Sequence, residues 1–341
     1  MKLLSVAIPC YNSAAYMRKC IDFMLECGEE MEIIIVNDGS KDSTLEIARE
    51  YEAEFPTIVK VIDKENGGHG SAVNAGLAVA TGVYFRVCDS DDYLQVDALK
   101  KMLKHMRESL EAGNEPDVYF TNYVYDHQFD NTTHVNSLAK QMPPNRLFAW
   151  NEMKHWGVSD YMLMHSMTFK TERIRASKMH LPEHCFYVDE IYCYQPLPFV
   201  EKLCYLDLDL YWYFIGRPDQ SVTVENMKKR YMMQLTVITE MFRPYTYEDL
   251  KKLPKKLRKY MIHVLRIMTT VAMAYVYMDK GKERVENYRA FRKNVKAMNP
   301  SLYKKIFHHA YMPFLRSIPP WLSVRIYPLG YQFFKRKLKL G

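Results

Sequence analysis

Short apolar runs alternate with helical segments through the first 121 residues, and this alternation limits the fold more than any other feature. The apolar, β-rich runs are Leu3–Ile8, Glu32–Val36, Val59–Asp63, Val83–Cys88 and Asp117–Thr121. The segments between them have helical spacing and include Ala14–Cys27, Ser43–Tyr51, Ser71–Ala80 and Val96–Arg107. Strands that alternate with helices form a parallel sheet covered on both faces. We therefore predict an α/β fold with a parallel central sheet.

The fourth apolar run ends in clustered carboxylates. Val83–Tyr93 reads VYFRVCDSDDY, so that Asp89, Ser90, Asp91 and Asp92 follow the strand directly. Open α/β sheets bind ligands at the carboxyl ends of their strands. Two carboxylates at positions i and i+2 are able to hold a hard divalent cation, Mg²⁺ or Mn²⁺, through oxygen. The alternative is a polar turn that caps the next helix, and an Asp-x-Asp pattern alone does not separate the two.

A glycine-rich loop follows the third run. Residues 66–70 read NGGHG and precede a helix of small residues. Glycines allow close approach of the backbone to a ligand, and a helix N-terminus favours phosphate. The loop lacks the Gly-Lys-Ser/Thr of a P-loop, and it follows the third strand rather than the first, so neither the P-loop nor the dinucleotide-binding fingerprint fits. His69 taken alone is most simply a structural loop histidine.

The order of these motifs resembles the family 2 inverting glycosyltransferases with the A-type fold, of the bacterial cell-envelope and polysaccharide type. The resemblance runs from Leu4 to about Thr223. The matching stretches are VAIPCYN (Val6–Asn12), IIIVNDGSKDST (Ile33–Thr44), ENGGHGSAVNAGLAVATG (Glu65–Gly82), VCDSDDYL (Val87–Leu94), YVDEIY (Tyr187–Tyr192) and LYWYFIGRPDQSVT (Leu210–Thr223). The resemblance implies a Rossmann-like fold whose central sheet is mixed and mainly parallel. It also implies transfer of a sugar from a nucleotide sugar, with Mg²⁺ or Mn²⁺ as cofactor.

The resemblance also implies roles for single residues. Asp91 would hold the cation that bridges the diphosphate, and Asp89 would lie near the ribose and serve as a second candidate metal ligand. Asp38 would accept a hydrogen bond from uracil, although an Asx turn before Gly39 explains it equally well. The remaining candidates for binding the nucleotide sugar are Pro9, Tyr11, Asn12, Gly68, His69, Asn74, Ser90, Arg217 and Ser221.

An inverting transfer needs a base that takes the proton from the acceptor hydroxyl. Asp189 in YVDEIY falls at the position of the family's catalytic acid pair, where this chain has Val188 before it and Glu190 after it. We predict Asp189 as the base, with Glu190 as the alternative. A surface acidic pair without a catalytic role is the simpler structural explanation.

Net charge is distributed unevenly. The whole chain carries +7, but residues 251–341 contain 22 Lys and Arg against 3 Asp and Glu. A strongly basic segment favours an anionic partner such as a lipid surface. Trp, Tyr and Phe mixed with Lys and Arg after Ile318 suit a headgroup interface, whereas the alternative is a basic end that packs on its own domain or on a second subunit. No recognition motif for nucleic acid accompanies the charge.

Two regions are predicted. Residues 1–225 would form the catalytic domain, with residues 1–121 as the nucleotide-sugar half and residues 122–225 as the acceptor half. Residues 226–341 would form a helical, basic region for attachment to a membrane surface. Tyr260–Met278 is rather apolar, but His263 and Arg266 near its middle are costly in a bilayer, so we expect a buried or surface-lying helix.

The predicted protein is a metal-dependent inverting glycosyltransferase. Its donor would be a nucleotide sugar, of the uridine diphosphate type, and its acceptor a glycan, lipid-linked or cell-envelope hydroxyl. Seven scattered cysteines without a CxxC pair, and an N-terminus without an apolar signal region, favour a cytoplasmic location at the inner face of the membrane. A nucleotidyltransferase and a non-catalytic nucleotide-sugar scaffold remain alternatives, and a homo-oligomer is left open.

Overall fold

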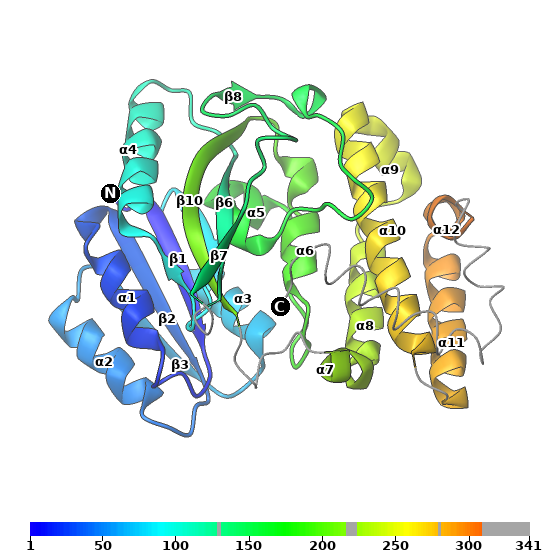
Figure 1. Ribbon diagram of the computed structural model, residues 1–341, viewed down its shortest axis with the longest axis horizontal. Coiled ribbons are helices and arrows are strands. Elements are labelled where there is room, and N and C mark those ends of the chain that lie inside the picture. The colour runs from blue at the N-terminus through cyan, green and yellow to red at the C-terminus, as the bar shows by residue number, and fades with distance from the viewer. Residues whose placement is uncertain (128–130, 216–223, 279–280, 309–341) are drawn as a thin grey trace. The chain divides into compact units, whose positions relative to one another are not determined.

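The computed structural model describes residues 1–127, 131–215, 224–278 and 281–308 (Figure 1). The chain divides into two compact units. The first consists of residues 1–155 and 162–215, and the second of residues 156–161 and 216–341. The first unit contains one sheet with its covering helices, and the second is helical.

The first four long strands form the parallel half of the sheet. They are β1 (Leu4–Cys10), β2 (Met31–Asp38), β3 (Val59–Lys64) and β4 (Tyr84–Val87). Their order is β3-β2-β1-β4, and every neighbouring pair is parallel. The helices between them are α1 (Met17–Leu25), α2 (Thr44–Glu54) and α3 (His69–Val79), with a short 3₁₀ turn η1 (Gly28–Glu30) before β2. The predicted alternation of strands and helices is confirmed here.

Opposite faces of this half-sheet are covered by different helices. Alternating side chains of β1, such as Val6 and Ile8, join one buried core with residues of α1, α2 and α4 (Val96–Glu111) (Figure 1). Ala7 points to the other face, where α3 lies close: a Cβ added at Gly76 would lie 2.7 Å from the Ala7 Cβ. The small residues of α3 therefore serve helix-to-sheet packing.

The sequence Ser43-Thr44-Leu45-Glu46 has the pattern of a capping box, but this box is not formed at the start of α2. Ser43 is the N-cap residue but makes no side-chain capping bond. Asp42 takes over part of that role, because its carboxylate accepts from the Thr44 amide at 3.1 Å and from the Ala14 amide at 3.1 Å. Asp42 thereby connects the loops after β1 and β2, a long-range contact that outweighs the local capping pattern.

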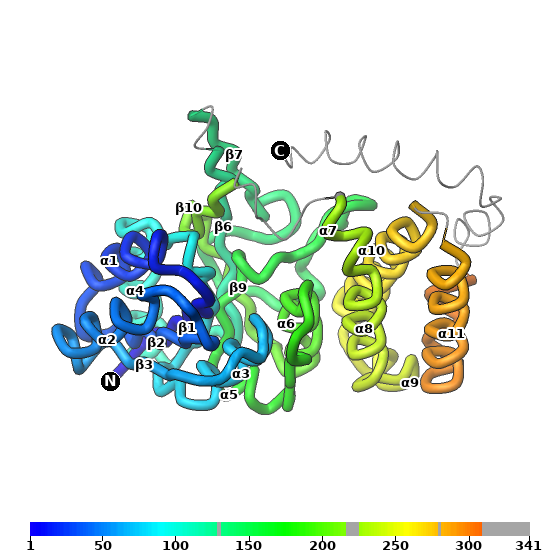
Figure 2. The backbone as a smooth tube through the Cα atoms, turned by 90° about the horizontal axis from the view of Figure 1, so that it is seen from below, coloured from blue at the N-terminus to red at the C-terminus, as the bar shows by residue number. Residues whose placement is uncertain are grey.

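The second half of the sheet is mixed. Strand β9 (Met167–Lys170) lies antiparallel between β4 and β6 (Val118–His127), and β10 (Leu203–Ile215) runs parallel to β6. The edge strands are β5 (Tyr93–Leu94), β7 (Thr132–Asn136) and β8 (Leu147–Phe148). Figure 2 shows β7 extending from β6 at one end of the sheet. The sheet is therefore mixed and mainly parallel, as the sequence predicts.

Short helical segments complete the first unit. They are η2 (Trp150–Glu152), η3 (Met164–Ser166), α5 (Thr171–Ala176), α6 (Asp189–Tyr194) and η4 (Leu197–Phe199). Two of them contribute to the site described below. Segment η3 leads into β9, and α6 begins at Asp189, the predicted base.

Asp117 joins three segments in the second half of the sheet: the start of β6, helix α5 and the residues just before β10. Its carboxylate is 3% exposed and accepts from Arg173 Nε at 2.7 Å and from the amides of Glu201 and Lys202 at 2.8 and 2.9 Å. Burial alone would raise the pKa of Asp117, but these amides and the charge of Arg173 outweigh it, so the pKa is lowered. The ionised carboxylate is therefore the form that stabilises the fold.

We expect Asp117→Asn to lower the free energy of unfolding at pH 7 by about 1.5–3 kcal/mol, as is typical of hydrogen bonds to a charged group. The folded pKa lies below the unfolded value, so this stabilisation is present above about pH 4 and is lost as the pH falls through the folded pKa. Urea unfolding at pH 7 and at pH 3, with exposed Asp97→Asn as control, measures both effects. An equal loss at the two pH values would contradict this account.

The second unit is a helical bundle with an apolar core. Its helices are α7 (Val224–Lys229), α8 (Tyr231–Phe242), α9 (Tyr247–Lys252), α10 (Lys255–Tyr277), α11 (Lys282–Met298) and α12 (Pro300–Phe307). Figures 1 and 2 show α8, α10 and α11 side by side. Trp156 belongs to this unit as well, since its ring lies 4.8 Å from that of Tyr260.

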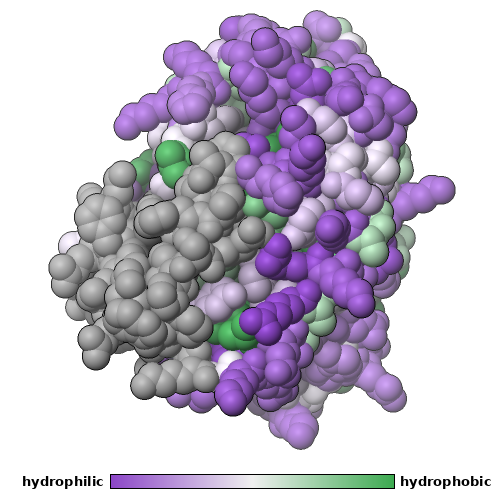
Figure 3. All heavy atoms as spheres, turned by 90° about the vertical axis from the view of Figure 1, so that its right-hand side faces the viewer, coloured by the Kyte–Doolittle hydropathy of each residue, from purple (hydrophilic) through white to green (hydrophobic). Residues whose placement is uncertain are grey.

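Helix α10 is long and apolar enough to cross a membrane, judged by length and composition alone. Its most apolar window is 61% buried inside the protein, as is typical of the central helix of a bundle. Figure 3 views the side of the molecule that carries α11, where the coloured surface is mostly hydrophilic. Helix α11 has exposed cations along one face at Lys282, Arg289, Lys293 and Lys296.

Candidate active site

The ends of the parallel strands meet at one edge of the sheet, and direct contacts join the loops there. Asn12 follows β1 and adopts a left-handed conformation, with φ 51°. Its amide donates to Ser40 Oγ at 3.0 Å, and its side-chain oxygen accepts from the Lys41 amide at 2.8 Å. The hydroxyls of Ser13 and Ser90 lie 2.8 Å apart. The loops after β1, β2 and β4 therefore form one connected surface.

The predicted residues of the first strand differ in exposure. Pro9 is buried within β1, opposite Val36 of β2. Tyr11 is 51% exposed at the end of the strand, an unusual position for a large aromatic side chain. An exposed ring beside a ligand-binding edge suits stacking on a nucleobase. The amide and the side-chain oxygen of Asn12 make the loop contacts given above.

Asp38 organises the glycine loop. Its carboxylate is 3% exposed and accepts from Lys64 Nζ at 2.8 Å and from the amides of Gly67 and Gly68 at 2.9 and 2.7 Å. The Asx-type contact in this turn is made instead by Asn37, which accepts from the Ser40 amide at 3.3 Å. A carboxylate offers about four acceptor sites, so a further donor such as uracil N3–H fits beside these three.

At the glycine loop, the groups that lie close to Gly68 and Gly70 belong to another segment of the protein. Gly68 has φ +83°, and a Cβ at this position would lie 3.2 Å from the His184 amide nitrogen. A Cβ at Gly70 would lie 2.7 Å from the Pro182 carbonyl oxygen. Asn74 donates to the Leu181 carbonyl at 2.9 Å and accepts from the Leu181 amide at 3.1 Å. Gly68 and Asn74 therefore anchor the segment that precedes α6.

His69 and Asp89 form an ion pair at this edge. Nε2 of His69 lies 2.9 Å from Oδ1 of Asp89, and the two side chains are 31% and 27% exposed. Burial alone would lower the pKa of His69, but the bond with Asp89 and the charges of Asp89 and Asp189 outweigh it and raise the pKa. Burial would raise the pKa of Asp89, whereas the bond to His69 and its charge lower it. Solvent at these half-buried groups weakens both effects.

Asp92 belongs to the scaffold of the acidic loop. It is 1% exposed and accepts from the Tyr211 hydroxyl at 2.5 Å and from the Phe214 amide at 2.9 Å. Burial, followed by the charges of Asp91 and Asp89, raises the pKa of Asp92 well above that of an ordinary aspartate. Asp91, the predicted metal ligand, is half-buried in the same loop.

His165 also lies in this cluster, although the sequence does not predict it as a site residue. Its ring stacks on Tyr211 and Tyr213, with centroids 4.4 and 4.9 Å away. Burial lowers its pKa to about 4, against the opposing charge of Asp89, so the imidazole is neutral at pH 7. Nothing in the local sequence MHSM distinguishes it from a core histidine.

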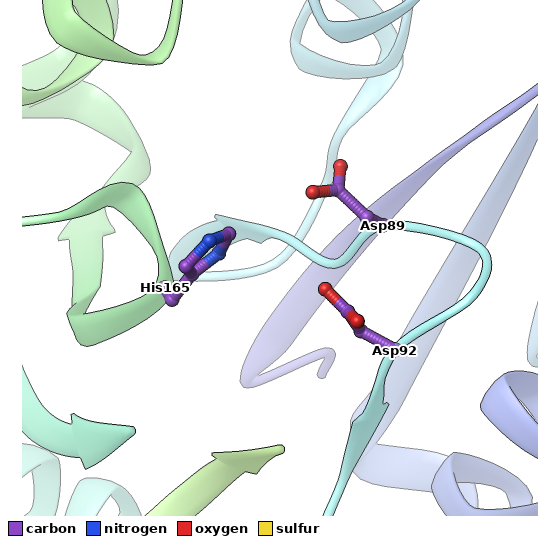
Figure 4. Close-up of side chains that lie close together, drawn as sticks. All are labelled: Asp89, Asp92 and His165. Carbon is purple, nitrogen blue, oxygen red and sulfur yellow. The ribbon is translucent and has the colours of Figure 1, made fainter. Parts of the chain in front are cut away.

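Three of these side chains are close enough to hold a metal ion together. Figure 4 shows Asp89 and Asp92 on one turn of the chain and His165 facing them from a separate segment, with one ligand atom of each within 4.8 Å of the others. Two oxygens and a neutral imidazole nitrogen suit a divalent first-row ion. Among the described residues, this group contains the predicted ligand Asp89 but not Asp91.

The two candidate bases open α6. The segment before it is tightly bent, because His184 and Tyr187 adopt φ 49° and 66°, a conformation rare for residues other than glycine. Burial raises the pKa of Asp189; the charge of His69 opposes this rise, and that of Asp89 adds to it. Asp189 therefore lies within electrostatic reach of the His69–Asp89 pair. Glu190 is also half-buried.

Arg217 and Ser221 lie outside the described residues.

Comparisons with known proteins show which sequences and structures this chain resembles. Residues 5–171 match the family model described as "Glycosyl transferase family 2". Chondroitin synthase from Pasteurella multocida (strain Pm70) is 41% identical over 121 residues, which is 35% of this chain and 12% of that protein. Glycosyltransferase GlyA from Streptococcus pneumoniae serotype 4 is 28% identical over 228 residues, which is 63% of this chain and 31% of that protein. The matches thus span less than two thirds of either relative.

A solved structure has the same fold over nearly the whole chain. S. aureus TarS residues 1–349, in complex with UDP-GlcNAc, superposes with a TM-score of 0.69 and 17% identity. The match covers 97% of this chain and 92% of that one. At this identity the likeness concerns the fold, and it confirms the predicted fold class.

Proposed function

We propose that the protein, whose residues 5–171 match the model of glycosyl transferase family 2, transfers a sugar from a uridine diphosphate sugar to a hydroxyl group of a glycan acceptor. The observation that carries this proposal is the convergence of Asp38, the His69–Asp89 pair and Asp189 at one edge of the sheet. The complex of TarS with UDP-GlcNAc supports a uridine diphosphate donor on this fold.

The donor would lie along the loops after β1, β2 and β4. Tyr11 offers an exposed ring for the base, and Asp38 offers a remaining acceptor site for uracil N3–H. The amides at the start of α3 favour the negative diphosphate. Asp91 and Asp89 would hold a divalent cation beside it. When bound, this cation offsets the charge that develops on the departing nucleoside diphosphate.

Asp189 is the base in this proposal. Its carboxylate takes the proton from the acceptor hydroxyl, whose oxygen then forms a bond to the anomeric carbon of the donor. The bond from that carbon to the diphosphate breaks in the same step, and the electron pair leaves with the nucleoside diphosphate. Burial raises the pKa of Asp189 and so makes it a stronger base than an exposed aspartate. A single displacement of this kind inverts the configuration at the anomeric carbon.

The proposal extends to the acceptor and to the location of the enzyme. Polysaccharide synthesis is the activity named for the chondroitin synthase relative, which supports a glycan or lipid-linked acceptor. The exposed cations on one face of α11 support attachment to the anionic cytoplasmic face of a membrane. Co-sedimentation with anionic vesicles that falls with added salt would support this attachment, and equal binding to neutral vesicles would contradict it.

A donor screen tests the proposal. UDP-glucose, UDP-N-acetylglucosamine, UDP-galactose and UDP-glucuronic acid are each incubated with the enzyme and Mn²⁺, with GDP-mannose as control. We expect calorimetry to detect binding of at least one UDP-sugar, followed by slow release of UDP. Release of pyrophosphate would identify a nucleotidyltransferase, and binding without turnover in the presence of acceptor glycans would favour a scaffold.

A further inference from the structure

His165 lies at a distance from Asp89 and Asp92 that suits a shared metal ion. Its ligand atom and those of Asp89 and Asp92 are within 4.8 Å of one another. Opposite ligands of an octahedral Mg²⁺ lie about 4.2 Å apart, since each bond is about 2.1 Å. The limit of 4.8 Å for the three ligand atoms is close to this span. Asp89 and Asp92 flank the turn between β4 and β5, whereas His165 comes from η3.

The imidazole is held in place from three sides. Tyr211 and Tyr213 stack on the ring with interplanar angles of 25° and 24°. Arg86, which is fully buried, donates from Nη2 to the His165 carbonyl oxygen at 2.6 Å. A ring fixed by two aromatic planes and an anchored backbone is oriented before any ligand arrives, as a metal site requires.

One ring nitrogen is left unsatisfied. Nδ1 of His165 is buried and has no hydrogen-bond partner among the described residues. Buried polar atoms in native proteins are nearly always paired, and an exception calls for an ion, a water or a functional explanation. The unpaired nitrogen is a second feature of His165, besides the spacing of the three ligand atoms, that a bound partner would explain.

We propose that His165 supplies an imidazole ligand to the divalent cation of this site, together with Asp89, and that the site consequently prefers Mn²⁺ to Mg²⁺. The inference rests on the proposed function, since the cation serves the donor diphosphate. Both oxygens of Asp92 already accept hydrogen bonds, so Asp92 contributes its charge and holds Tyr211 against the imidazole. A nitrogen ligand favours first-row transition ions over the hard, oxygen-seeking Mg²⁺.

Pulsed electron paramagnetic resonance of Mn²⁺ bound in the presence of UDP tests the ligand directly. We expect coupling to a ¹⁴N nucleus in the wild type, replaced by ¹⁵N coupling when histidine alone is labelled with ¹⁵N. Absence of histidine coupling while Mn²⁺ and UDP bind would overturn the inference and leave the proposed transferase intact. Failure of UDP to bind, with or without Mn²⁺, would count against the proposed function itself.

Two variants extend the test. His165→Phe keeps a stacked ring without a ligand atom, and we expect it to lose the nitrogen coupling and to bind Mn²⁺ at least about tenfold more weakly. His165→Asn replaces nitrogen by an amide oxygen, and we expect the ratio of Mn²⁺ to Mg²⁺ affinity to fall. His155→Phe, at an exposed histidine, is the matched control. Unchanged coupling and affinity in both His165 variants would overturn the inference, and if either variant fails to fold, the labelled wild type decides.

Discussion

Asp189→Asn is expected to lower kcat by about 10²–10⁴-fold, the usual contribution of a positioned general base. Asparagine has nearly the same shape but cannot accept the acceptor's proton, so the affinity for the donor should change little. Steady-state kinetics with the donor found in the screen, together with calorimetry of UDP binding, measure the two quantities separately. A loss of donor affinity equal to the loss of rate would contradict the role of a base.

The pH profile adds a second readout to the same variant. Because burial raises the pKa of Asp189, the wild-type rate should begin to fall at a higher pH than an ordinary aspartate would give. The falling acid limb should be absent from the residual activity of Asp189→Asn. Glu190→Gln is the matched control, since it removes the neighbouring acid of α6. If Glu190→Gln loses the rate and Asp189→Asn does not, the base is Glu190.

Asp91→Ala should abolish the dependence of turnover on a divalent cation and lower kcat/KM by at least about 10²-fold, because charge stabilisation by a bound cation is worth several kcal/mol. Removing this carboxylate leaves the charge that develops on the diphosphate poorly compensated. Kinetics over a range of Mn²⁺ concentrations measure the effect. Asp97→Ala changes an exposed aspartate in the first turn of α4 and serves as control.

A variant of the neighbouring residue Asp92 separates an effect on stability from the effect expected of Asp91→Ala. Asp92→Asn alters a buried residue that holds Tyr211 and Phe214, so we expect it to lower stability as well as activity. Asp91→Ala should leave the unfolding midpoint close to that of the wild type. Retention of full metal-dependent turnover in Asp91→Ala would show that the cation is held without Asp91, by Asp89 and His165.

The parallel half of the fold could be predicted because its signals are local. Buried β-rich runs, each followed by a helical segment, define β1 to β4 and α1 to α3 within a few residues. The same logic brings Asp38 and Asp89 to one edge, because parallel strands end there. Each of these elements follows from the pattern of its own residues, which a single sequence displays directly.

The rest depends on contacts between distant segments. Strand β9 enters the sheet antiparallel between β4 and β6, and no local pattern indicates this insertion. His165 reaches Asp89 only because of that insertion, and Asp92 is buried by Tyr211 and Phe214 of β10. In the glycine loop, a Cβ added at Gly68 or Gly70 would meet the segment before α6, whereas one added at Gly67 would meet Ser71 and Lys64. Sequence spacing alone cannot show which partner a glycine or an aspartate will meet.

The most direct test of the account is the configuration of the first sugar released when water replaces the acceptor. Proton NMR follows the anomeric signals of an α-linked UDP-sugar incubated with the wild-type enzyme and Mg²⁺, which broadens these signals less than Mn²⁺ does. We predict that the donor signal declines and that the β-anomer of the free sugar appears first, before mutarotation mixes the two forms. Initial release of the α-anomer would contradict a single displacement, and an undiminished signal for every donor tested would contradict the proposed transfer.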